Sequence, residues 1–309
     1  MNKSNSKSTS KLKVCIIGPG VVGQATGKAF IKHNIDTSFL GGNDEKRKKL
    51  EKEGYKVFSK NELFDGKYDF DISFLTVPTP TVNKKINLDY IKEAAIDLGK
   101  RLKLSKKEYH LVVVKSTVPP GTTKNIVGRL VEKYSNKKLG KNLGLAMNPE
   151  YLREKTALED SIKPWVILIG EYDKKSGDIL ENFYKIFKAP IYRCSLEEAE
   201  YQKYVHNLFN ANKITFFNEM RKVAKKFNFN ADKIFEITCL SCEGLWNPKY
   251  GIYDYGPFSG SCLPKDTQAF LNWAENKKIK LPLLKKIIEV NNKLLTKKQL
   301  NKKVIGYQL

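Results

Sequence analysis

Short apolar runs alternate with longer amphipathic stretches over the first two thirds of the chain. Between the runs, stretches such as Asp89 to Leu104 and Thr122 to Tyr134 repeat apolar residues at the three- and four-residue spacing of a helix. Strands that alternate with helices are typical of a parallel sheet. From Lys13 to about Tyr192 the pattern therefore predicts a doubly wound α/β domain. Its six candidate strands are KVCIIG, DTSFL, FDISFLTV, YHLVVVKS, LGLAM and WVILIG.

A different pattern begins at about Leu196. The segment EEAEYQKYVHNLFNANKITFFNEMRKVAKKF has no strand alternation and no proline. Its apolar residues recur at helical intervals, and we expect them to form a buried stripe that includes Tyr204, Leu208, Ala211 and Ile214. A long helix is thus predicted to open a second, mainly helical domain.

The chain of 309 residues carries a net charge of +23, which attracts polyanions. Its lysines are interleaved with acidic residues and accompany no recognisable nucleic-acid-binding module, so we favour a solvated lysine-rich surface over nucleic-acid binding. No apolar run is long enough to span a bilayer. Residues 1–12 lack the apolar core of a secretory signal and are predicted to be a disordered tail, so we expect a cytoplasmic protein.

The five cysteines are an odd number, which fits reduced thiols in that compartment. Cys239 and Cys242 have the spacing of a redox or metal pair, but no second pair accompanies them and their surroundings are apolar. We therefore predict buried structural thiols at these two positions and no metal site.

A glycine-rich turn, GPGVVG, follows the first predicted strand and opens the first predicted helix. Glycines in this context let a pyrophosphate approach the amide groups at the helix N-terminus. The turn therefore predicts a dinucleotide site at Gly18, Gly20, Val21, Val22 and Gly23.

The second strand ends without the acidic residue that usually hydrogen-bonds the adenosine ribose. Gly41 occupies that position, and Asn43 and Asp44 follow it. Without a carboxylate there, one barrier to a 2′-phosphate is removed, and Lys46 or Arg47 could bind that phosphate. We expect NAD as the cofactor and leave NADP open.

Four further segments carry polar and turn residues in a fixed order: FLTVPTPT (74–81), KSTVPPGTT (115–123), NPEYLREKTA (148–157) and FSGSCLPKD (258–266). With GPGVVG and the EAEYQKYVHN helix, they resemble the UDP-glucose/GDP-mannose dehydrogenase family from about Lys13 to Asn292. The resemblance implies a Rossmann-like NAD-binding domain at 13–194 and a helical central domain at 195–309 that carries a catalytic cysteine. It also implies a homodimer formed through the long helix that starts near Leu196.

The activity implied by the resemblance is the NAD-dependent oxidation of UDP-glucose to UDP-glucuronate. A UDP-N-acetyl-hexosamine or GDP-mannose is the alternative nucleotide-sugar substrate. A two-electron β-hydroxyacid dehydrogenase shares the two-domain plan but needs no thiol. Outside the enzyme class, the alternative is a catalytically impaired binding or scaffold protein derived from this family.

Cys262 is the candidate nucleophile. A primary alcohol becomes an acid by losing two hydrides, and a thiolate can hold the intermediate aldehyde as a thiohemiacetal and then as a thioester that water hydrolyses. A lone cysteine is more often a small buried apolar residue. Here Gly260 and Pro264 indicate a loop, and the neighbouring charges of Lys265 and Asp266 favour the nucleophile.

The resemblance assigns roles to other side chains. Lys203 and Asn207, four apart on one helix, would stabilise an oxyanion. Glu150 is the candidate base for the hydrolytic water, which Thr117 and Asp266 would order. Besides Lys46, contacts to the dinucleotide are implied for Thr79, Thr117, Glu154 and Lys265. Contacts to the nucleotide sugar are implied for Glu150, Tyr151, Leu152, Lys203, Asn207, Tyr253, Gly256, Phe258, Ser259 and Gly260.

Three features depart from the family pattern. The loop before the cysteine reads PFSGSC where the family has GFGGSC, so backbone freedom is reduced. The stretch WNPK, with Lys249, replaces an arginine that grips the substrate. Family members also continue into a third domain that clamps the nucleotide diphosphate, whereas this sequence stops at Leu309. We expect that domain to be a separate chain, to be cut from this sequence, or to be lost because the substrate is smaller or different.

Overall fold

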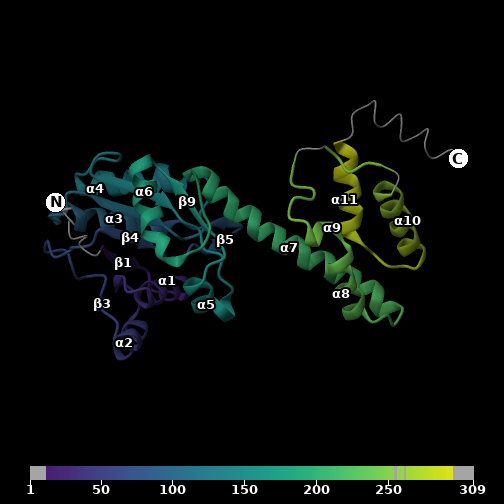
Figure 1. Cartoon of the computed structure of the whole chain (residues 1–309), viewed down its shortest axis with the longest axis horizontal. Coiled ribbons are helices and arrows are strands. Elements are labelled where there is room, and N and C mark those ends of the chain that lie inside the picture. The colour runs from purple at the N-terminus through teal and green to yellow at the C-terminus, as the bar shows by residue number, and fades with distance from the viewer. Residues whose placement is uncertain (1–11, 254–255, 261, 295–309) are drawn as a thin grey trace, which may run out of the picture. The chain divides into compact units, whose positions relative to one another are not determined.

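The computed structural model describes residues 12–253, 256–260 and 262–294. Apart from Leu12, the predicted N-terminal tail lies outside these residues, and so does Ser261. The chain divides into two compact units, 1–206 and 207–309 (Figure 1). No helix among the described residues is long and apolar enough to cross a membrane.

The first unit is built on an eight-stranded sheet with the order β10-β9-β8-β7-β4-β1-β2-β3. All six predicted strands are present, and the helix predicted at Asp89 to Leu104 has those bounds. The strands are β1 (Lys13–Ile17), β2 (Asp36–Leu40), β3 (Val57–Phe58), β4 (Ile72–Leu75), β7 (His110–Val114), β8 (Leu143–Met147), β9 (Ile167–Glu171) and β10 (Ile191–Ser195). The helices are α1 (Val21–Lys32), α2 (Asp44–Lys52), α3 (Asp89–Leu104), α4 (Arg129–Ser135), α5 (Ala157–Ile162) and α6 (Lys174–Tyr184).

The predicted doubly wound fold is confirmed, with one strand pair that differs from the expected parallel arrangement. β9 pairs with β8 in antiparallel fashion, while β10 is parallel to β9. The segment between β8 and β9 contains one 3₁₀ turn (Glu154–Thr156) and the short helix α5, which packs against α1. Antiparallel neighbours need no long crossover, and a buried apolar run contains no signal of its direction.

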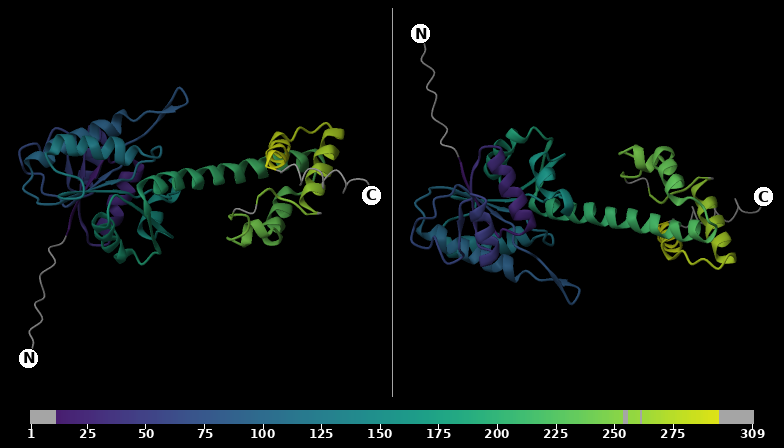
Figure 2. Two further views of the ribbon diagram at one scale, coloured as in Figure 1. Left: turned by 90° about the horizontal axis from the view of Figure 1, so that it is seen from above. Right: turned by 90° about the horizontal axis from the view of Figure 1, so that it is seen from below.

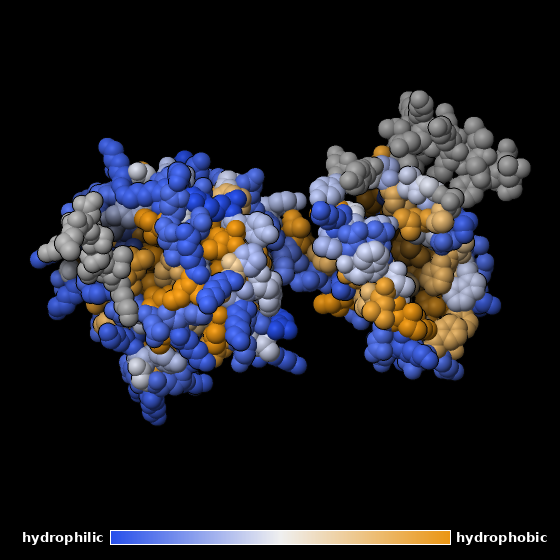
Figure 3. Space-filling view, in the orientation of Figure 1, coloured by the Kyte–Doolittle hydropathy of each residue, from blue (hydrophilic) through white to orange (hydrophobic). Residues whose placement is uncertain are grey.

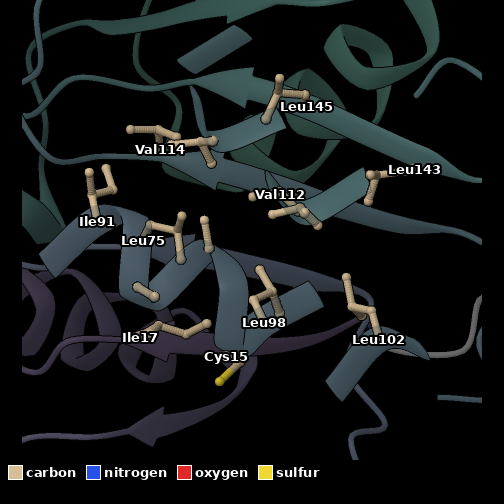
Figure 4. Packing of buried hydrophobic residues seen from close by; sticks show 14 of the residues in the cluster. Cys15, Ile17, Leu75, Ile91, Leu98, Leu102, Val112, Val114, Leu143 and Leu145 are labelled. Atoms are coloured by element: carbon tan, nitrogen blue, oxygen red, sulfur yellow. The ribbon is translucent and has the colours of Figure 1, made fainter. Parts of the chain in front are cut away.

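Both faces of the sheet are covered, which explains the unbroken apolar runs. Successive residues of β1 point to opposite faces, so Cys15 belongs to one buried cluster and Ile16 to the other. Figure 4 shows Leu98 and Leu102 of α3 against strand residues such as Val112. On the other face, α1 and α6 contribute an aromatic cluster that includes Phe30, Phe183 and Tyr184.

A row of hydrogen-bonded polar side chains lies in the core of the first unit. His110 is fully buried, with its Nδ1 2.9 Å from the Phe70 carbonyl oxygen and its Nε2 2.9 Å from Ser73 Oγ. Because a carbonyl only accepts, Nδ1 carries the proton, and the Ser73 hydroxyl donates to Nε2. The Tyr68 hydroxyl lies 2.5 Å from the same Ser73 oxygen. Burial lowers the pKa of His110 to about 4.

Smaller elements connect the larger ones. β5 (Thr81–Val82) and β6 (Lys85–Ile86) form a hairpin that projects from the first unit (Figure 2). Its turn residues Asn83 and Lys84 both have positive φ, as a two-residue hairpin turn requires. The remaining elements are a π-helix at Thr123–Gly128 and 3₁₀ helices at Glu154–Thr156 and Lys185–Phe187.

The second unit is helical, as predicted. It contains the end of α7 (Leu196–Lys226), then α8 (Ala231–Ser241), α9 (Glu243–Trp246), α10 (Leu263–Asn276) and α11 (Pro282–Lys293). A small cluster around Val223, Ala274, Leu281 and Ile288 forms its core.

Two predictions about burial are wrong. In the predicted stripe of α7, Leu208 and Ile214 are 65% and 61% exposed, Ala211 is exposed, and only Tyr204 is half-buried. Periodicity shows that residues share a face, but not whether another element covers that face. Cys239 and Cys242 are exposed too; both lie near the end of α8, and neither belongs to the core cluster.

Candidate active site

The glycine-rich turn has the geometry of an anion-binding site. Gly18 has φ +96°, and a Cβ on it would lie 2.8 Å from Val77 Cγ1. At Gly23 a Cβ would lie 2.6 Å from Thr76 Oγ1, so this glycine allows close packing. At Gly20 a Cβ would project into open space, so the missing side chain leaves room for a ligand. Gly20 is the N-cap of α1, and no side chain caps that helix. Its first amides therefore suit a pyrophosphate.

A cleft of about 830 Å³ opens over this turn. The Thr79 hydroxyl donates to the Thr117 carbonyl oxygen at 2.7 Å, which joins two of its walls. Eight of the predicted residues line the cleft: Gly18, Gly20, Val21, Val22, Lys46, Thr79, Thr117 and Glu150. The glycine positions, the open space and the uncapped helix fit a dinucleotide such as NAD.

One residue of the first unit that was predicted to contact the dinucleotide lies outside the cleft lining. Glu154 lies in the 3₁₀ helix 154–156, is exposed and is absent from the lining of the cleft. Glu150 precedes that helix and lies in an irregular segment. Lys265 lies in the second unit.

A buried ion pair lies at the wall of this cleft. The Lys203 ammonium of α7 donates to the Glu150 carbonyl oxygen at 2.5 Å and lies 3.0 Å from Glu150 Oε1. Lys203 is only 4% exposed. The other carboxylate oxygen of Glu150 accepts from the Leu152 amide at 2.7 Å. The structure thus brings together two residues that the sequence assigned to the site from distant segments.

Sequence reasoning missed a second buried lysine beside this pair. The Lys115 ammonium, at the end of β7, donates to Asn148 Oδ1 at 2.7 Å, and the Tyr184 hydroxyl donates to the same oxygen at 2.6 Å. Burial lowers the pKa of Lys115 to about 8; the charge of Glu150 opposes this shift and that of Lys203 adds to it. The only signal in the sequence was a lysine directly after an apolar strand.

Tyr151 and Leu152 line a smaller cavity of about 50 Å³. Lys115 and Glu150 border both this cavity and the dinucleotide cleft. The Tyr151 hydroxyl donates to Gln202 Oε1 at 2.5 Å, which fixes this side chain against α7.

The remaining candidates lie in the second unit. Cys262 is the exposed N-cap of α10, and its carbonyl oxygen accepts from the Asp266 amide at 2.9 Å. The Lys265 ammonium donates to Asp266 Oδ1 at 2.5 Å. The thiol, one ammonium and one carboxylate therefore share the first turn of a helix. Asn207 is exposed and lies one turn after Lys203 on α7.

The loop before Cys262 is anchored through its backbone. Asn291 of α11, 5% exposed, accepts from the Phe258 amide at 2.8 Å and donates to the Phe258 carbonyl oxygen at 3.0 Å. Gly256 and Gly260 have φ +76° and +84°, so the glycines that remain in this loop are needed for its path. Of the predicted substrate loop, Tyr253, Phe258 and Ser259 are also described.

Known proteins with similar sequences agree with the geometry. Residues 12–188 match the UDP-glucose/GDP-mannose dehydrogenase family, NAD binding domain, and residues 197–293 match its central domain. The chain is 38% identical to GDP-mannose 6-dehydrogenase of Pseudomonas aeruginosa over 230 residues, 74% of this chain and 52% of the relative. It is 33% identical to a UDP-glucose 6-dehydrogenase of Bacillus subtilis, over 94% of this chain and 69% of the relative. The chain thus spans about half the length of the GDP-mannose relatives.

Solved structures are similar over most of the chain. A ternary complex of GDP-mannose dehydrogenase from Pseudomonas aeruginosa matches with a TM-score of 0.84 and 31% identity, covering 92% of this chain and 69% of that one. A UDP-glucose dehydrogenase from Pyrobaculum islandicum matches with a TM-score of 0.67 and 30% identity, covering 93% and 69%. The resemblance inferred from the six motifs is confirmed, NAD is the cofactor of the matched domain, and the chain belongs to the UDP-glucose/GDP-mannose dehydrogenase family.

Proposed function

We propose that the chain is a nucleotide-sugar 6-dehydrogenase that converts the C6 alcohol of the sugar to a carboxylate in two oxidations. The observation that carries this proposal is the buried Lys203–Glu150 pair at the wall of the dinucleotide cleft. A simple hydride transfer needs one base, whereas formation of an acid also needs a group that stabilises tetrahedral oxyanions and a base for water. Lys203 and Glu150 are suited to these two tasks.

The lysine is held in place to act as a fixed positive charge. Its ammonium is turned toward Glu150, so little conformational freedom has to be lost when a substrate oxygen becomes negative nearby. Glu150 keeps one oxygen on the Leu152 amide, which orients the carboxylate. Bound NAD supplies the hydride acceptor for each oxidation. The Thr79–Thr117 hydrogen bond joins two walls of the cleft in which NAD would bind.

Cys262 provides the covalent step of the proposal. Its thiolate adds to the aldehyde carbon and forms a C–S bond, giving a thiohemiacetal whose hydride then leaves. The resulting thioester is attacked by water, the C–S bond breaks and the thiolate is restored. Overall, one alcohol, two NAD⁺ and one water give one carboxylate, two NADH and three protons. The N-terminus of α10 favours negative charge at this position.

GDP-mannose is the substrate that we propose to test first. The sequence alone pointed to UDP-glucose, but the GDP-mannose relatives are 38% to 40% identical and the UDP-glucose relatives 30% and 33%. The higher identity extends over a smaller part of the chain, so UDP-glucose remains the second candidate.

The experiment measures NADH and acid formed from each nucleotide sugar. We expect two NADH per sugar consumed, and a decrease of roughly 10³-fold or more in acid formation for Cys262→Ser, because the covalent step is lost. Cys239→Ser is the matched control, since Cys239 is exposed but lies in α8, and its rate should be unchanged.

Other outcomes identify the alternatives. One NADH per sugar with an aldehyde product would favour a two-electron dehydrogenase. Binding of NADH and nucleotide sugar without any turnover would favour a binding or scaffold protein. Equal rates for Cys262→Ser and the native chain would contradict the covalent step.

We also infer that the second unit pairs with a second copy of the chain. Its support is the exposed apolar stripe of α7, where Leu208, Phe209 and Ile214 are 58% to 65% exposed. Light scattering should give twice the chain mass, and Leu208→Asp should shift the equilibrium toward the monomer. A native monomer at micromolar concentration would contradict this inference.

A further inference from the structure

The end of β2 leaves open the position that selects between NAD and NADP. β2 ends at Leu40, and Gly41 and Gly42 follow with φ +92° and +85°. A Cβ on Gly41 would meet nothing within 4 Å. In NAD-binding sheets a carboxylate at this position accepts from the ribose 2′-hydroxyl and repels a 2′-phosphate. Here neither interaction is available, although both glycines line the cleft.

The side chain of Asn43, the residue that follows the two glycines, is hydrogen-bonded to the backbone. Asn43, which also lines the cleft, is the N-cap of α2, and its Oδ1 accepts from the Lys46 amide at 3.0 Å. This bond fixes the first turn of α2 and places Lys46 at the cleft. The N-terminus of α2 adds a partial positive charge at the same end.

The structure distinguishes the two basic residues that follow. The Arg47 guanidinium donates to the Gly42 carbonyl oxygen at 3.2 Å and to Asp44 Oδ1 at 2.5 Å, and Arg47 does not line the cleft. Lys46 is exposed, lines the cleft, and enters none of the ion pairs formed within residues 12–253, 256–260 and 262–294. Lys46 is therefore the cation available to a ligand.

A second lysine borders the same end of the cleft. Lys60 is positioned by Arg101 of α3, which is 2% exposed. The Arg101 guanidinium donates to the Lys60 carbonyl oxygen at 2.5 Å and to the Glu62 carbonyl oxygen at 3.3 Å. It also lies 3.8 Å above the Phe64 ring. A buried arginine thus braces the segment that presents Lys60.

Basic side chains outnumber acidic ones among the residues that line this part of the cleft. Lys46, Lys60 and Arg101 line the cleft here, against Glu93 and Asp97 of α3. Glu93 lies 3.5 Å from the Lys60 ammonium, which reduces its repulsion of a ligand. Asp44 and Glu45 border an adjoining hollow, and Asp44 is bound to Arg47.

We propose that this chain binds NADP as well as NAD, with the 2′-phosphate held by Lys46 and Lys60 in the space beside Gly41. The proposal rests on the dinucleotide role of the cleft and on no particular nucleotide sugar. A phosphate there would gain two charge-assisted hydrogen-bond donors and would meet no carboxylate from the end of β2.

Binding of NADH and NADPH to the whole chain, followed by nicotinamide fluorescence without any sugar, tests this directly. We expect the two dissociation constants to differ by less than tenfold. Lys46→Ala should weaken NADPH binding about fivefold or more and NADH binding less than twofold. Lys48→Ala is the matched control, because this exposed lysine of α2 does not line the cleft, and it should change neither constant.

A pair of substitutions at Gly41 tests the missing carboxylate. Gly41→Asp should weaken NADPH binding more than tenfold without weakening NADH binding beyond the effect of Gly41→Asn. Asparagine has the same size and the same tolerance of positive φ, so the comparison isolates the charge. Thermal melting checks that both variants remain folded.

Three results would overturn the proposal. The first is NADPH binding more than tenfold weaker than NADH binding in the native chain. The second is an equal loss of both cofactors in Lys46→Ala, and the third is an equal NADPH affinity in Gly41→Asp and Gly41→Asn. Failure of the proposed sugar oxidation would leave all of these binding constants unchanged, so the two failures are distinguishable.

Discussion

The two units of this chain bury their apolar residues to very different extents. The first unit covers both faces of its sheet with two clusters, in which side chains such as Phe30, Phe74 and Leu75 are 0% to 2% exposed. The second unit has one small cluster and leaves Leu208 and Leu240 65% and 81% exposed. Figure 3 shows apolar side chains at the surface of the second unit. The first unit therefore has the core of an independently folding domain, while the second presents the surface expected of an association domain.

The largest effect is expected when the same substitution, leucine to alanine, is made in each unit and the free energy of unfolding is compared. Leu75→Ala removes a fully buried side chain, and we expect it to lower the free energy of unfolding by about 2–5 kcal/mol. Leu208→Ala removes the same atoms from an exposed position and should change that free energy by less than about 0.5 kcal/mol at dilutions that favour the monomer. Urea unfolding of both variants measures this. Similar losses for the two leucines would mean that Leu208 is buried in the monomer.

Acid should weaken the first unit through His110. Its folded pKa of about 4 is below the ordinary value of 6.5, so the unfolded chain binds the extra proton first. The stability that depends on neutral His110 is complete above pH 6.5 and is lost as the pH falls from 6.5 to 4. The loss is about 3 kcal/mol from this difference in pKa. Protonated Nε2 would also face the Ser73 hydroxyl, which now donates to it.

Tryptophan fluorescence can assign this acid effect to one unit. Trp165 lies in the first unit, and Trp246 and Trp273 lie in the second. We expect the pH dependence between 6.5 and 4 to appear in the unfolding curve reported by Trp165 and to flatten in His110→Gln. An unchanged slope in His110→Gln would assign the acid sensitivity to another group.

The smallest losses of stability should come from two buried glutamates of α7, one in each unit. Each of them accepts hydrogen bonds from two backbone amides. Glu200 accepts from the Gly121 and Thr123 amides, at 2.5 and 2.6 Å. Glu219 accepts from the Leu283 and Leu284 amides at the start of α11, at 2.9 and 3.1 Å. Alanine at either position leaves two amides without their acceptor and should cost about 1–3 kcal/mol.

If the two units unfold independently, each glutamate substitution should destabilise only the unit that contains it. Glu200→Ala should lower the unfolding midpoint reported by Trp165, and Glu219→Ala the midpoint reported by Trp246 and Trp273. Glu197→Ala is the control, because this half-buried residue of the same helix accepts from none of these four amides, and it should shift neither midpoint. A single shift shared by all three tryptophans would show that the two units unfold together.

The sequence predicted the strands of the first unit well because their apolar runs are buried on both faces. It also predicted the bounds of α3, because the apolar residues from Asp89 to Leu104 have the spacing of one amphipathic helix. It did not predict the direction of β9, because strand direction depends on how the chain returns to the sheet. The very short strand β3 has too few residues for any periodicity to appear.

For the site, motifs located the glycine turn, Glu150 and Lys203 but missed Lys115 and Arg101. In a chain with 56 lysines and arginines, a buried cation has the same sequence signature as a surface one. The predicted burial of Cys239 and of Leu208 failed for the converse reason. Apolar neighbours in the sequence do not establish that a third element covers them.

The two hydrogen bonds between Asn291 and Phe258 make the tether of the loop independent of the identity of its side chain at 258. Both bonds use main-chain atoms of residue 258, so an exchange of the phenyl ring leaves the tether intact. Substitutions can therefore accumulate at 258 and 259 while the path of the loop is preserved, whereas position 291 tolerates only a side chain that both donates and accepts. A library that tests this loop as a determinant of specificity would therefore randomise 258 and 259 and keep Asn291.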